Sequence, residues 1–264
     1  MGVLPAFRLL RPRSVSEAVG WLNYDRLAYA GGTELLLAMR EGLLRPTHLV
    51  DLKGIEGLGS VEESSGEVTI GALVTHTQAA DHPIVGARLP GLAGVLQRVG
   101  NPRVRATGTL AGNLCFAEPR SDVAAALIAQ EGEVEIASPQ GRRRMAVRDF
   151  VVGPYSTALE PGELLTRIHV PIRPDVRFVY VKHQTAERPA LGVALSVNSH
   201  VSVVVGAVGL SPQAFEVGSL SALDVAEVAA RVEVVPDLTG SEEYKRHLVE
   251  VYLRRAIGRL ERGE

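Results

Sequence analysis

Residues 101–122, NPRVRATGTLAGNLCFAEPRSD, constrain this chain more than any other stretch, because they follow neither a helical nor a strand period. We therefore expect a long irregular loop here. Gly108, Ala111 and Gly112 leave little side-chain bulk, so backbone N–H groups can approach a ligand closely. An oligo-anion such as a pyrophosphate suits a loop of this kind. The alternative is a long turn between two helices with no ligand.

A second loop of small residues favours the ligand-binding interpretation. Residues 28–37 read AYAGGTELLL, where a short apolar run ends at Ala30 and a helical pattern begins at Thr33 and Glu34. This order predicts a strand, a glycine turn and a helix N-terminus, whose first N–H groups have no partner within the helix. Two such loops, each beside a helix start, can hold one diphosphate from two sides.

Composition and charge exclude several classes of protein. The chain has 264 residues, 46% hydrophobic and 22% charged, which is typical of a globular protein of two or three modest domains. A net charge of −2 gives no support for a nucleic-acid partner, and no apolar run reaches the roughly 18 residues of a membrane span. The single cysteine, Cys115, excludes an internal disulfide and an iron–sulfur cluster held by this chain alone. With no secretory signal visible, we expect a cytoplasmic location.

The order of the expected elements divides the chain into three parts. A β-α-β-α-β unit ends near Leu52, and the glycine- and serine-rich residues 53–66 follow it as a boundary. From Arg177 the pattern becomes antiparallel, with three β-rich runs followed by two helices. The last helix has a mixed amphipathic face, which suits either partner docking or plain core. The predicted domains are residues 1–53, 54–173 and 174–264.

Capping signals and β-rich runs place individual elements. Ser14 with Glu17, and Thr75 with Gln78, have the spacing of a capping box and predict helix starts. Another helix is expected to begin at Ser121. The expected hairpin covers residues 134–137 and 144–147, the three antiparallel strands cover 178–183, 191–197 and 201–208, and the last two helices cover 222–232 and 243–260.

Motifs for other chemistries are missing from the sequence. It contains no G-x-G-x-x-G fingerprint, no Walker loop and no G-x-S-x-G elbow. Its seven histidines are scattered without metal-ligand spacing, so each is expected at the surface or at a helix terminus. Cys115 has apolar neighbours, which indicates a buried and inert thiol. Asp122 is either a helix-start acid stabilised by the helix dipole or a ligand contact.

Four segments, in this order, resemble a known family. They are AGGTELL at residues 30–36, VTIGALVTHTQ at 68–78, TGTLAGNLCFAEPRSD at 107–122 and GELLTRIHVP at 162–171. Together they resemble the medium, FAD-binding subunit of molybdenum hydroxylases, a family that includes carbon monoxide dehydrogenase and xanthine dehydrogenase. The resemblance covers nearly the whole chain and is sharpest over residues 28–171.

The resemblance implies a fold, a cofactor and a site. The fold is α+β: a two-subdomain FAD-binding region of the vanillyl-alcohol-oxidase/MurB-like type, then a C-terminal domain with a three-stranded antiparallel sheet and helices. The cofactor is FAD. The implied FAD-binding residues are Ala30, Gly31, Gly32, Thr33, Glu34 and Leu35 in the first pyrophosphate loop; Thr109, Gly112 and Asn113 in the second; Asp122 at flavin nucleotide hydroxyls; Leu165 near the isoalloxazine; and Lys182 in a Y-x-K segment.

Two positions depart from the family pattern. Ala111 replaces the first glycine of the second loop, which is free of strain only if its φ is negative. The family usually has a basic cluster after the Y-x-K segment, and here that place is taken by His183, Gln184 and Thr185. The resemblance therefore does not extend to the side of the site where the flavin edge meets its electron acceptor.

The resemblance also implies an oxidoreductase that works in an assembly. The partners would be a molybdopterin-containing large subunit and a [2Fe–2S] small subunit, together with this chain a heterotrimer that dimerises. In such an assembly the flavin takes electrons from the iron–sulfur clusters and gives them to an external acceptor. Two alternatives remain open at this point: a stand-alone flavin reductase that uses a nicotinamide nucleotide, and a non-enzymatic flavin-binding regulatory module.

Overall fold

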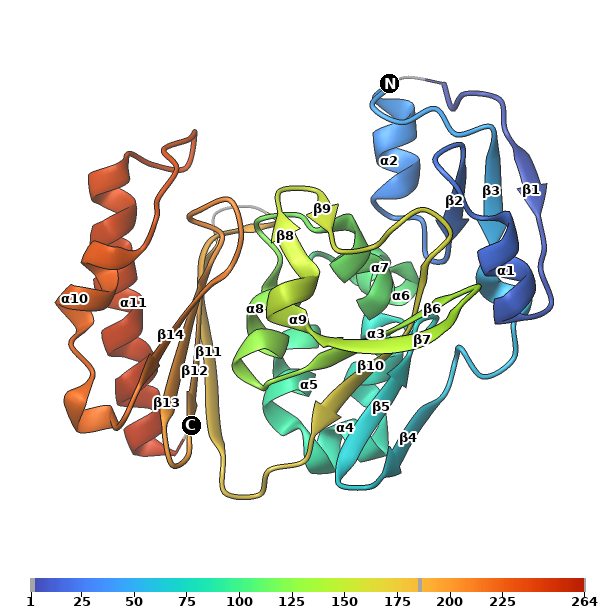
Figure 1. The fold of residues 1–264 in the computed structure, drawn as a ribbon. Helices are drawn as coiled ribbons and strands as arrows, with labels where there is room; N and C mark the ends of the chain where they lie inside the picture. The colour runs from blue at the N-terminus through green and yellow to red at the C-terminus, as the bar shows by residue number, and fades with distance from the viewer. Residues whose placement is uncertain (1–2, 185–186, 264) are drawn as a thin grey trace.

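The structure is a computed structural model that describes residues 3–184 and 187–263. The chain forms three parts placed side by side, with the N-terminal part at the right of Figure 1, the central part in the middle and the C-terminal part at the left. Each part is built on its own sheet, of three, five and four strands respectively. Within the described residues, no helix is both long and apolar enough to cross a membrane.

The N-terminal part is a small parallel sheet in the order β1-β3-β2, with the expected β-α-β-α-β connection. Ser14 caps the first helix, because its side chain accepts a hydrogen bond from the N–H of Glu17. The Glu17 carboxylate accepts from the N–H of Arg13, so the capping box is only half formed. The elements are β1 (Arg8–Leu10), α1 (Val15–Trp21), β2 (Arg26–Tyr29), α2 (Leu35–Arg40), β3 (His48–Asp51) and the 3-10 helix η1 (Leu52–Gly54).

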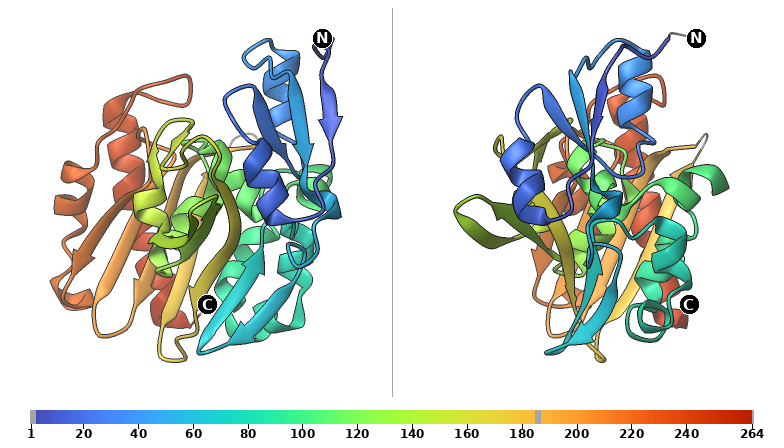
Figure 2. Two further views of the ribbon diagram at one scale, coloured as in Figure 1. Left: turned by 45° about the vertical axis from the view of Figure 1, so that its right-hand side comes forward. Right: turned by 90° about the vertical axis from the view of Figure 1, so that its right-hand side faces the viewer.

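The central part is a five-stranded antiparallel sheet in the order β4-β5-β10-β6-β7, with a bundle of short helices on one face (Figure 2). Its strands are β4 (Val61–Ser64), β5 (Glu67–Gly71), β6 (Glu133–Ser138), β7 (Gly141–Ala146) and β10 (Leu164–Pro171), and β8 (Val151–Gly153) and β9 (Ser156–Thr157) form a separate pair. Its helices are α3 (His76–Asp81), α4 (Pro83–Arg88), α5 (Pro90–Leu96), α6 (Pro102–Thr107), α7 (Leu110–Phe116), α8 (Asp122–Ala129) and α9 (Val147–Phe150).

In the central part the structure confirms one capping box and one hairpin, and it adds a strand. The Thr75–Gln78 capping box is complete, with both side chain to backbone bonds present at the start of α3. The expected hairpin is present as β6 and β7. Strand β4 lies within residues 53–66, which we had taken only as a boundary. It is an edge strand of sequence VEES with no buried residue, so it carries no hydrophobic pattern to detect.

The C-terminal sheet has four strands, not the predicted three, in the order β11-β12-β13-β14. The strand that was missed, β14, reads QAFEV and buries only Phe215, so it lacks the continuous apolar run of its neighbours. The elements are β11 (Arg177–Gln184), β12 (Pro189–Val197), β13 (Val201–Gly206), β14 (Gln213–Val217), the 3-10 helix η2 (Leu220–Ala222), α10 (Val225–Arg231) and α11 (Glu242–Arg262).

The apolar face of α11 belongs to the core. Its buried residues Leu248, Val249, Leu253, Ala256 and Leu260 join one hydrophobic cluster with the inward side chains of the C-terminal sheet. The interpretation of this face as a docking surface is therefore wrong, and the plain-core alternative is confirmed. The physical reason is that a four-stranded sheet needs one face covered, and α11 covers it together with α10.

Helix α8 joins the central and C-terminal parts into one core. All eight of its residues are buried, and it packs against α5 and α7 on one side and against β12 and β13 on the other. Ala194 and Val204 of the C-terminal sheet consequently belong to the same hydrophobic cluster as the central helices. The residue that begins this fully buried helix is Asp122, so its surroundings decide what it can do.

Candidate functional site

The first small-residue loop has the predicted strand, turn and helix order. Strand β2 ends at Tyr29, and α2 begins at Leu35. Gly32 has a φ of +73°, a conformation that an L side chain rarely adopts. A Cβ on Gly31 would lie 2.0 Å from the carbonyl oxygen of Thr107, so this glycine is required for the two loops to touch.

The second loop is not the irregular segment that we expected. Residues 102–107 and 110–116 form the short helices α6 and α7, separated by Gly108 and Thr109. Asn101 caps α6, and Thr109 caps α7 by accepting from the N–H of Gly112 at 3.0 Å. Helices of six and seven residues are too short to show a 3.6-residue period, so the pattern alone could not identify them. The capping residues were the signal that could have done so.

The Ala111 departure causes no backbone strain. This residue lies inside α7, is buried, and is not among the residues with positive φ. The φ of Ala111 is therefore negative, as a residue with a Cβ requires at this position.

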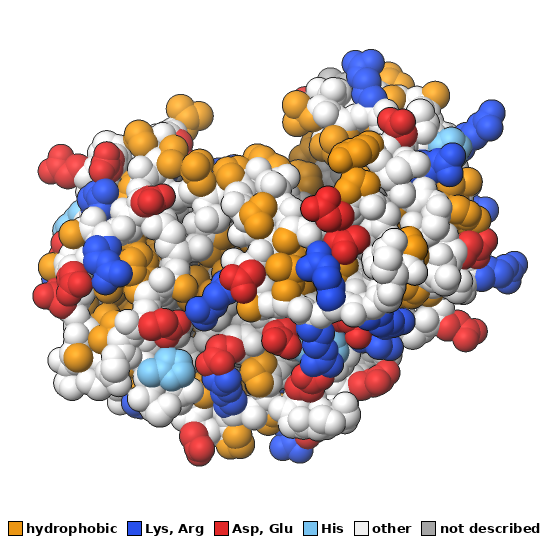
Figure 3. Space-filling view, viewed as in Figure 1, with side chains coloured by type: hydrophobic (Ala, Val, Ile, Leu, Met, Phe, Trp, Pro, Cys, Tyr) orange, Lys and Arg blue, Asp and Glu red, His pale blue; other side chains and the backbone are white. Residues whose placement is uncertain are grey.

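The two loops meet in a cavity of about 450 Å³. The surface is notched at the top of the molecule between the N-terminal part and the rest, as Figure 3 shows, with hydrophobic side chains along this notch. Ten of the twelve residues predicted to bind the cofactor line the cavity: Ala30, Gly31, Gly32, Thr33, Glu34, Leu35, Thr109, Gly112, Asn113 and Leu165. The structure thus brings together residues that are up to 135 positions apart in the sequence.

The other two predicted residues, Asp122 and Lys182, do not line this cavity but bind each other. Lys182 Nζ lies 2.9 Å from Asp122 Oδ2, and the Tyr180 hydroxyl donates to Asp122 Oδ1 at 2.6 Å. Lys182 Nζ also donates to the carbonyl of Arg98 at 2.7 Å. Both members of the ion pair are deeply buried, with side-chain exposures of 8% and 3%. Burial, and then the Asp122 charge, hold the pKa of Tyr180 well above its usual range.

This buried pair is linked to the cavity by a short chain of bonds. Asp122 follows Ser121, whose hydroxyl caps α8 and donates to Asn113 Oδ1 at 2.6 Å. Asn113 in turn lines the cavity. Asp122 is therefore a first-turn acid of α8, as one interpretation held, but it is also one half of a buried ion pair that the sequence did not reveal.

His76 is a cavity residue that the sequence analysis missed. It lines the cavity, is only 1% exposed, and its Nδ1 has no hydrogen-bond partner among the residues that the structure describes. Its backbone N–H donates to the carbonyl of Gly108 at 3.0 Å, which ties α3 to the gap between α6 and α7. Burial, and then the charge of Arg105, lower the pKa of His76 to about 4, so its ring is neutral at pH 7. It is the first residue of α3, as expected of a helix-terminal histidine, but it is not at the surface.

Cys115 also lines the cavity and carries an unreactive thiol. Burial raises its pKa to about 12, so the thiolate is scarce at neutral pH. The raised pKa agrees with the expectation of an inert thiol, but the residue as a whole is half-buried rather than buried. Among the described residues, no three His, Cys, Asp or Glu side chains are placed to hold a metal ion.

The segment that departs from the family's basic cluster is only partly described. His183 faces α11, where its Nδ1 lies 3.0 Å from the Tyr252 hydroxyl and the two rings meet edge to face. Gln184 ends β11, and Thr185 lies outside the described residues.

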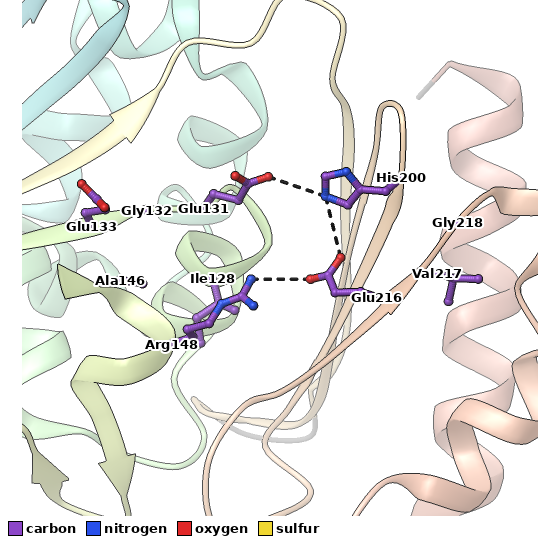
Figure 4. A pocket seen from close by; sticks show the side chains of 10 residues that line it. All are labelled: Ile128, Glu131, Gly132, Glu133, Ala146, Arg148, His200, Glu216, Val217 and Gly218. Atoms are coloured by element: carbon purple, nitrogen blue, oxygen red, sulfur yellow. Dashed lines mark hydrogen bonds and ion pairs between the residues drawn. The ribbon is translucent and has the colours of Figure 1, made fainter.

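A second cavity, of about 600 Å³, is larger but has a different character (Figure 4). It lies between the C-terminal end of α8 and the strands β13 and β14, and Glu131, Arg148, His200 and Glu216 line it. These charged side chains are paired with one another, with Arg148 Nη2 3.5 Å from Glu216 Oε1 and His200 Nε2 within 4 Å of both carboxylates. Because its charged side chains are paired with one another, this cavity has the character of a seam between two sheets rather than of a ligand site.

The residues of the first cavity fit an elongated cofactor with a diphosphate. Cβ atoms would fill the space at Gly31 and strain the backbone at Gly32. Helix starts at α2 and α7 present N–H groups that lack intrahelical partners. The neutral His76 ring offers one further unpaired nitrogen, and leucine side chains supply apolar surface for an aromatic ring system.

Comparison with known proteins gives a consistent answer. Residues 5–173 match the family described as the FAD binding domain in molybdopterin dehydrogenase. The nicotine 6-hydroxylase medium subunit of Paenarthrobacter nicotinovorans is 31% identical over 96% of this chain and 97% of that protein. The carbon monoxide dehydrogenase medium chain of Afipia carboxidovorans is also 31% identical, over 96% of each chain.

Solved structures resemble the fold along its whole length. Carbon monoxide dehydrogenase from Hydrogenophaga pseudoflava superposes with a TM-score of 0.91 at 29% identity, covering 99% of both chains. Quinoline 2-oxidoreductase from Pseudomonas putida 86 gives a TM-score of 0.90 at 28% identity, again over 99% of both chains.

Proposed function

Because this chain belongs to the family of FAD-binding domains of molybdopterin dehydrogenases, we propose that it is the electron-transfer flavin subunit of a molybdenum-containing hydroxylase. FAD is its cofactor, and the chain is part of an oxidoreductase. In the proposed role, FAD receives electrons from [2Fe–2S] clusters of a partner and passes them to an external acceptor.

The observation that carries this proposal is the convergence of the two loops. Ten residues that the family resemblance assigns to FAD line one cavity, although they come from three separate segments of the chain. A nucleotide diphosphate needs N–H donors from more than one direction, and the starts of α2 and α7 supply them from two sides.

The residues of this chain bind and orient the cofactor. Gly31 and Gly32 let the first loop reach the second, and Thr109 fixes the start of α7. His76 stays neutral, and no described residue bonds its Nδ1, so the ring can exchange a hydrogen bond with the bound cofactor. Leu165 supplies apolar surface where the resemblance places the isoalloxazine. When bound, the flavin supplies the redox chemistry, and no side chain of this chain is needed as a nucleophile.

The proposal includes two partner subunits and a cytoplasmic location. The relatives of this chain are named as medium subunits or medium chains. We propose that this chain assembles with a large subunit that carries molybdopterin and a small subunit that carries [2Fe–2S] clusters, in a heterotrimer that dimerises. The contacts of Asp122 and Lys182 with FAD remain predictions. In this structure both Asp122 oxygens already accept hydrogen bonds, one from the Tyr180 hydroxyl and one from Lys182 Nζ.

Purification of the tagged chain from its native cell tests the proposal. We expect FAD in equal amount to the chain, together with two further polypeptides, one containing iron and the other molybdenum. Visible spectra and metal analysis of the same sample are the measurements. FAD without iron or molybdenum, with rapid NADH oxidation by the chain alone, would replace the proposal with a stand-alone reductase. A colourless chain that binds no added FAD would exclude every flavin-dependent function of this chain, including the proposed one.

A further inference from the structure

One guanidinium joins all three parts of the chain at the edge of the FAD cavity. Arg188 Nη2 donates to both oxygens of Glu34 at 2.8 Å, and its Nη1 contacts Glu118 Oε2. Glu118 is buried and is also bonded to Arg120 at 3.2 Å and to the Tyr155 hydroxyl at 3.0 Å. Arg188 precedes β12 in the C-terminal part, Glu34 lies in the first loop, and Glu118 follows α7.

The position of Glu34 makes this bridge unusual. Glu34 lines the cavity in the same loop whose N–H groups would face the diphosphate of bound FAD. It occupies the N-cap position of α2, yet its side chain makes no capping hydrogen bond, because it is turned towards Arg188. A carboxylate beside a diphosphate repels it, and this repulsion is strong where the groups are only partly exposed to water. Glu34 is 24% exposed and Arg188 is 31% exposed at the side chain.

We propose that Arg188 is the positioning residue of the diphosphate site: it neutralises Glu34 in the cofactor loop and holds that loop against residue 118. The proposal rests on FAD being the cofactor, and it adds a residue outside the matched family region of residues 5–173. Arg188 does not line the cavity, so it acts on the cofactor through Glu34. Without Arg188, the loop would present an uncompensated negative charge to an anionic ligand.

A simple structural bridge between domains is the alternative, and it makes a different prediction. If Arg188 only ties the parts together, removing Glu34 as well as Arg188 removes a second member of the bridge and cannot help. If Arg188 neutralises Glu34, removing the carboxylate cancels the repulsion and restores binding. The double variant therefore distinguishes charge neutralisation from mechanical attachment.

The experiment uses the full chain stripped of flavin and titrated with FAD, with quenching of flavin fluorescence as the readout. The variants are Arg188→Gln, Arg188→Gln with Glu34→Gln, and the matched control Arg148→Gln. Arg148 also joins the central part to the C-terminal sheet, through Glu216 at 3.5 Å, but it lies at the second cavity (Figure 4). The melting temperature of each flavin-free variant shows whether it folds.

We expect Arg188→Gln to weaken FAD binding about 10- to 100-fold, as the loss of a charge-compensating partner does. We expect the double variant to recover at least tenfold of this loss, and Arg148→Gln to stay within about threefold of the original chain. Raising the salt concentration should reduce the deficit of Arg188→Gln, because screening weakens charge repulsion. If Arg188→Gln does not fold, Arg188→Lys is compared with the original chain. It keeps the charge but loses the planar two-oxygen contact with Glu34, so charge neutralisation predicts FAD binding close to that of the original chain, and mechanical attachment predicts a loss.

Three results would overturn the proposal. The double variant binding FAD as weakly as Arg188→Gln would show a mechanical bridge only. Equal losses for Arg188→Gln and Arg148→Gln would show a general effect of domain attachment. A deficit that does not change with salt would exclude charge repulsion. Failure of the unaltered chain to bind FAD is a separate outcome, and it would refute the proposed function instead.

Discussion

Replacing Asp122 by alanine is the most informative perturbation of the fold, because it leaves a buried lysine without its counter-charge. Lys182 has 8% side-chain exposure, and its remaining partner would be the carbonyl of Arg98. The Tyr180 hydroxyl would also lose the acceptor that it reaches at 2.6 Å. Removing one member of a buried ion pair costs about 3–5 kcal/mol. For a chain of this size that corresponds to a fall in melting temperature of roughly 6–20 °C.

The measurement is thermal unfolding of the flavin-free chain, followed by circular dichroism, so that FAD binding does not contribute to stability. Glu250→Ala is the control, because it removes one member of the Glu250–Arg254 pair on α11, whose side chains are 33% and 59% exposed, and should cost below about 1 kcal/mol. The double variant Asp122→Ala with Lys182→Met should recover about 2 kcal/mol or more, since an apolar pair of similar volume replaces the lone charge.

Equal, small effects of Asp122→Ala and Glu250→Ala would refute this reasoning. They would mean that Asp122 is no more than a first-turn acid of α8, whose interaction with the helix dipole is worth about 0.3–1 kcal/mol. A separate FAD titration tests the ligand contact that the family resemblance implies. That contact predicts an additional loss of about 1.5–3 kcal/mol in FAD binding for Asp122→Ala.

Three further predictions concern the cavity. Gly31→Ala should abolish most FAD binding, measured as flavin content after reconstitution, because its Cβ would lie 2.0 Å from the Thr107 oxygen; Gly20→Ala, where the Cβ meets open space, should bind normally. The folded pKa of His76, about 4, lies below the unfolded value, so the unfolded state binds the proton first and stability should fall by roughly 3 kcal/mol as pH drops from about 6.5 to about 4. Urea unfolding across this pH range should show the slope, and His76→Gln should flatten it. The Cys115 thiol should resist alkylation at pH 8 until the chain is unfolded, as counted by mass spectrometry; fast labelling of the native chain would contradict its raised pKa.

Local signals were sufficient to predict most of the elements and the two small-residue loops, whereas the individual cavity residues such as Leu165 were implied by the family resemblance. Glycine turns, capping residues and apolar runs act over a few positions, so they can be recognised without the fold. They placed α1, α3 and α8, the hairpin β6–β7 and the first loop. They failed where an element was short or polar, as for α6, α7, β4 and β14, because such elements are stabilised by their neighbours rather than by their own pattern.

Long-range charge pairs could not be predicted from the sequence. Glu34 and Arg188 are 154 positions apart, and Asp122 and Lys182 are 60 apart. Each of these residues resembles an ordinary surface charge when viewed in its own segment, since nothing local distinguishes a paired carboxylate from a solvated one. His76 was missed for a related reason: its burial arises from the packing of α3 against α6, which the local sequence does not show.

These pairs change how the C-terminal part should be understood. Among residues 3–184 and 187–263, none beyond Leu165 lines the cavity that we propose for FAD, and the family match ends at residue 173. Yet Lys182 and Arg188, both beyond that limit, neutralise Asp122 and Glu34 on the other side of the boundary. A chain ending at residue 173 would leave two partly or fully buried carboxylates without counter-charges, and would also expose the face of α8 that packs on β12 and β13. The C-terminal sheet therefore stabilises the proposed cofactor site without lining it.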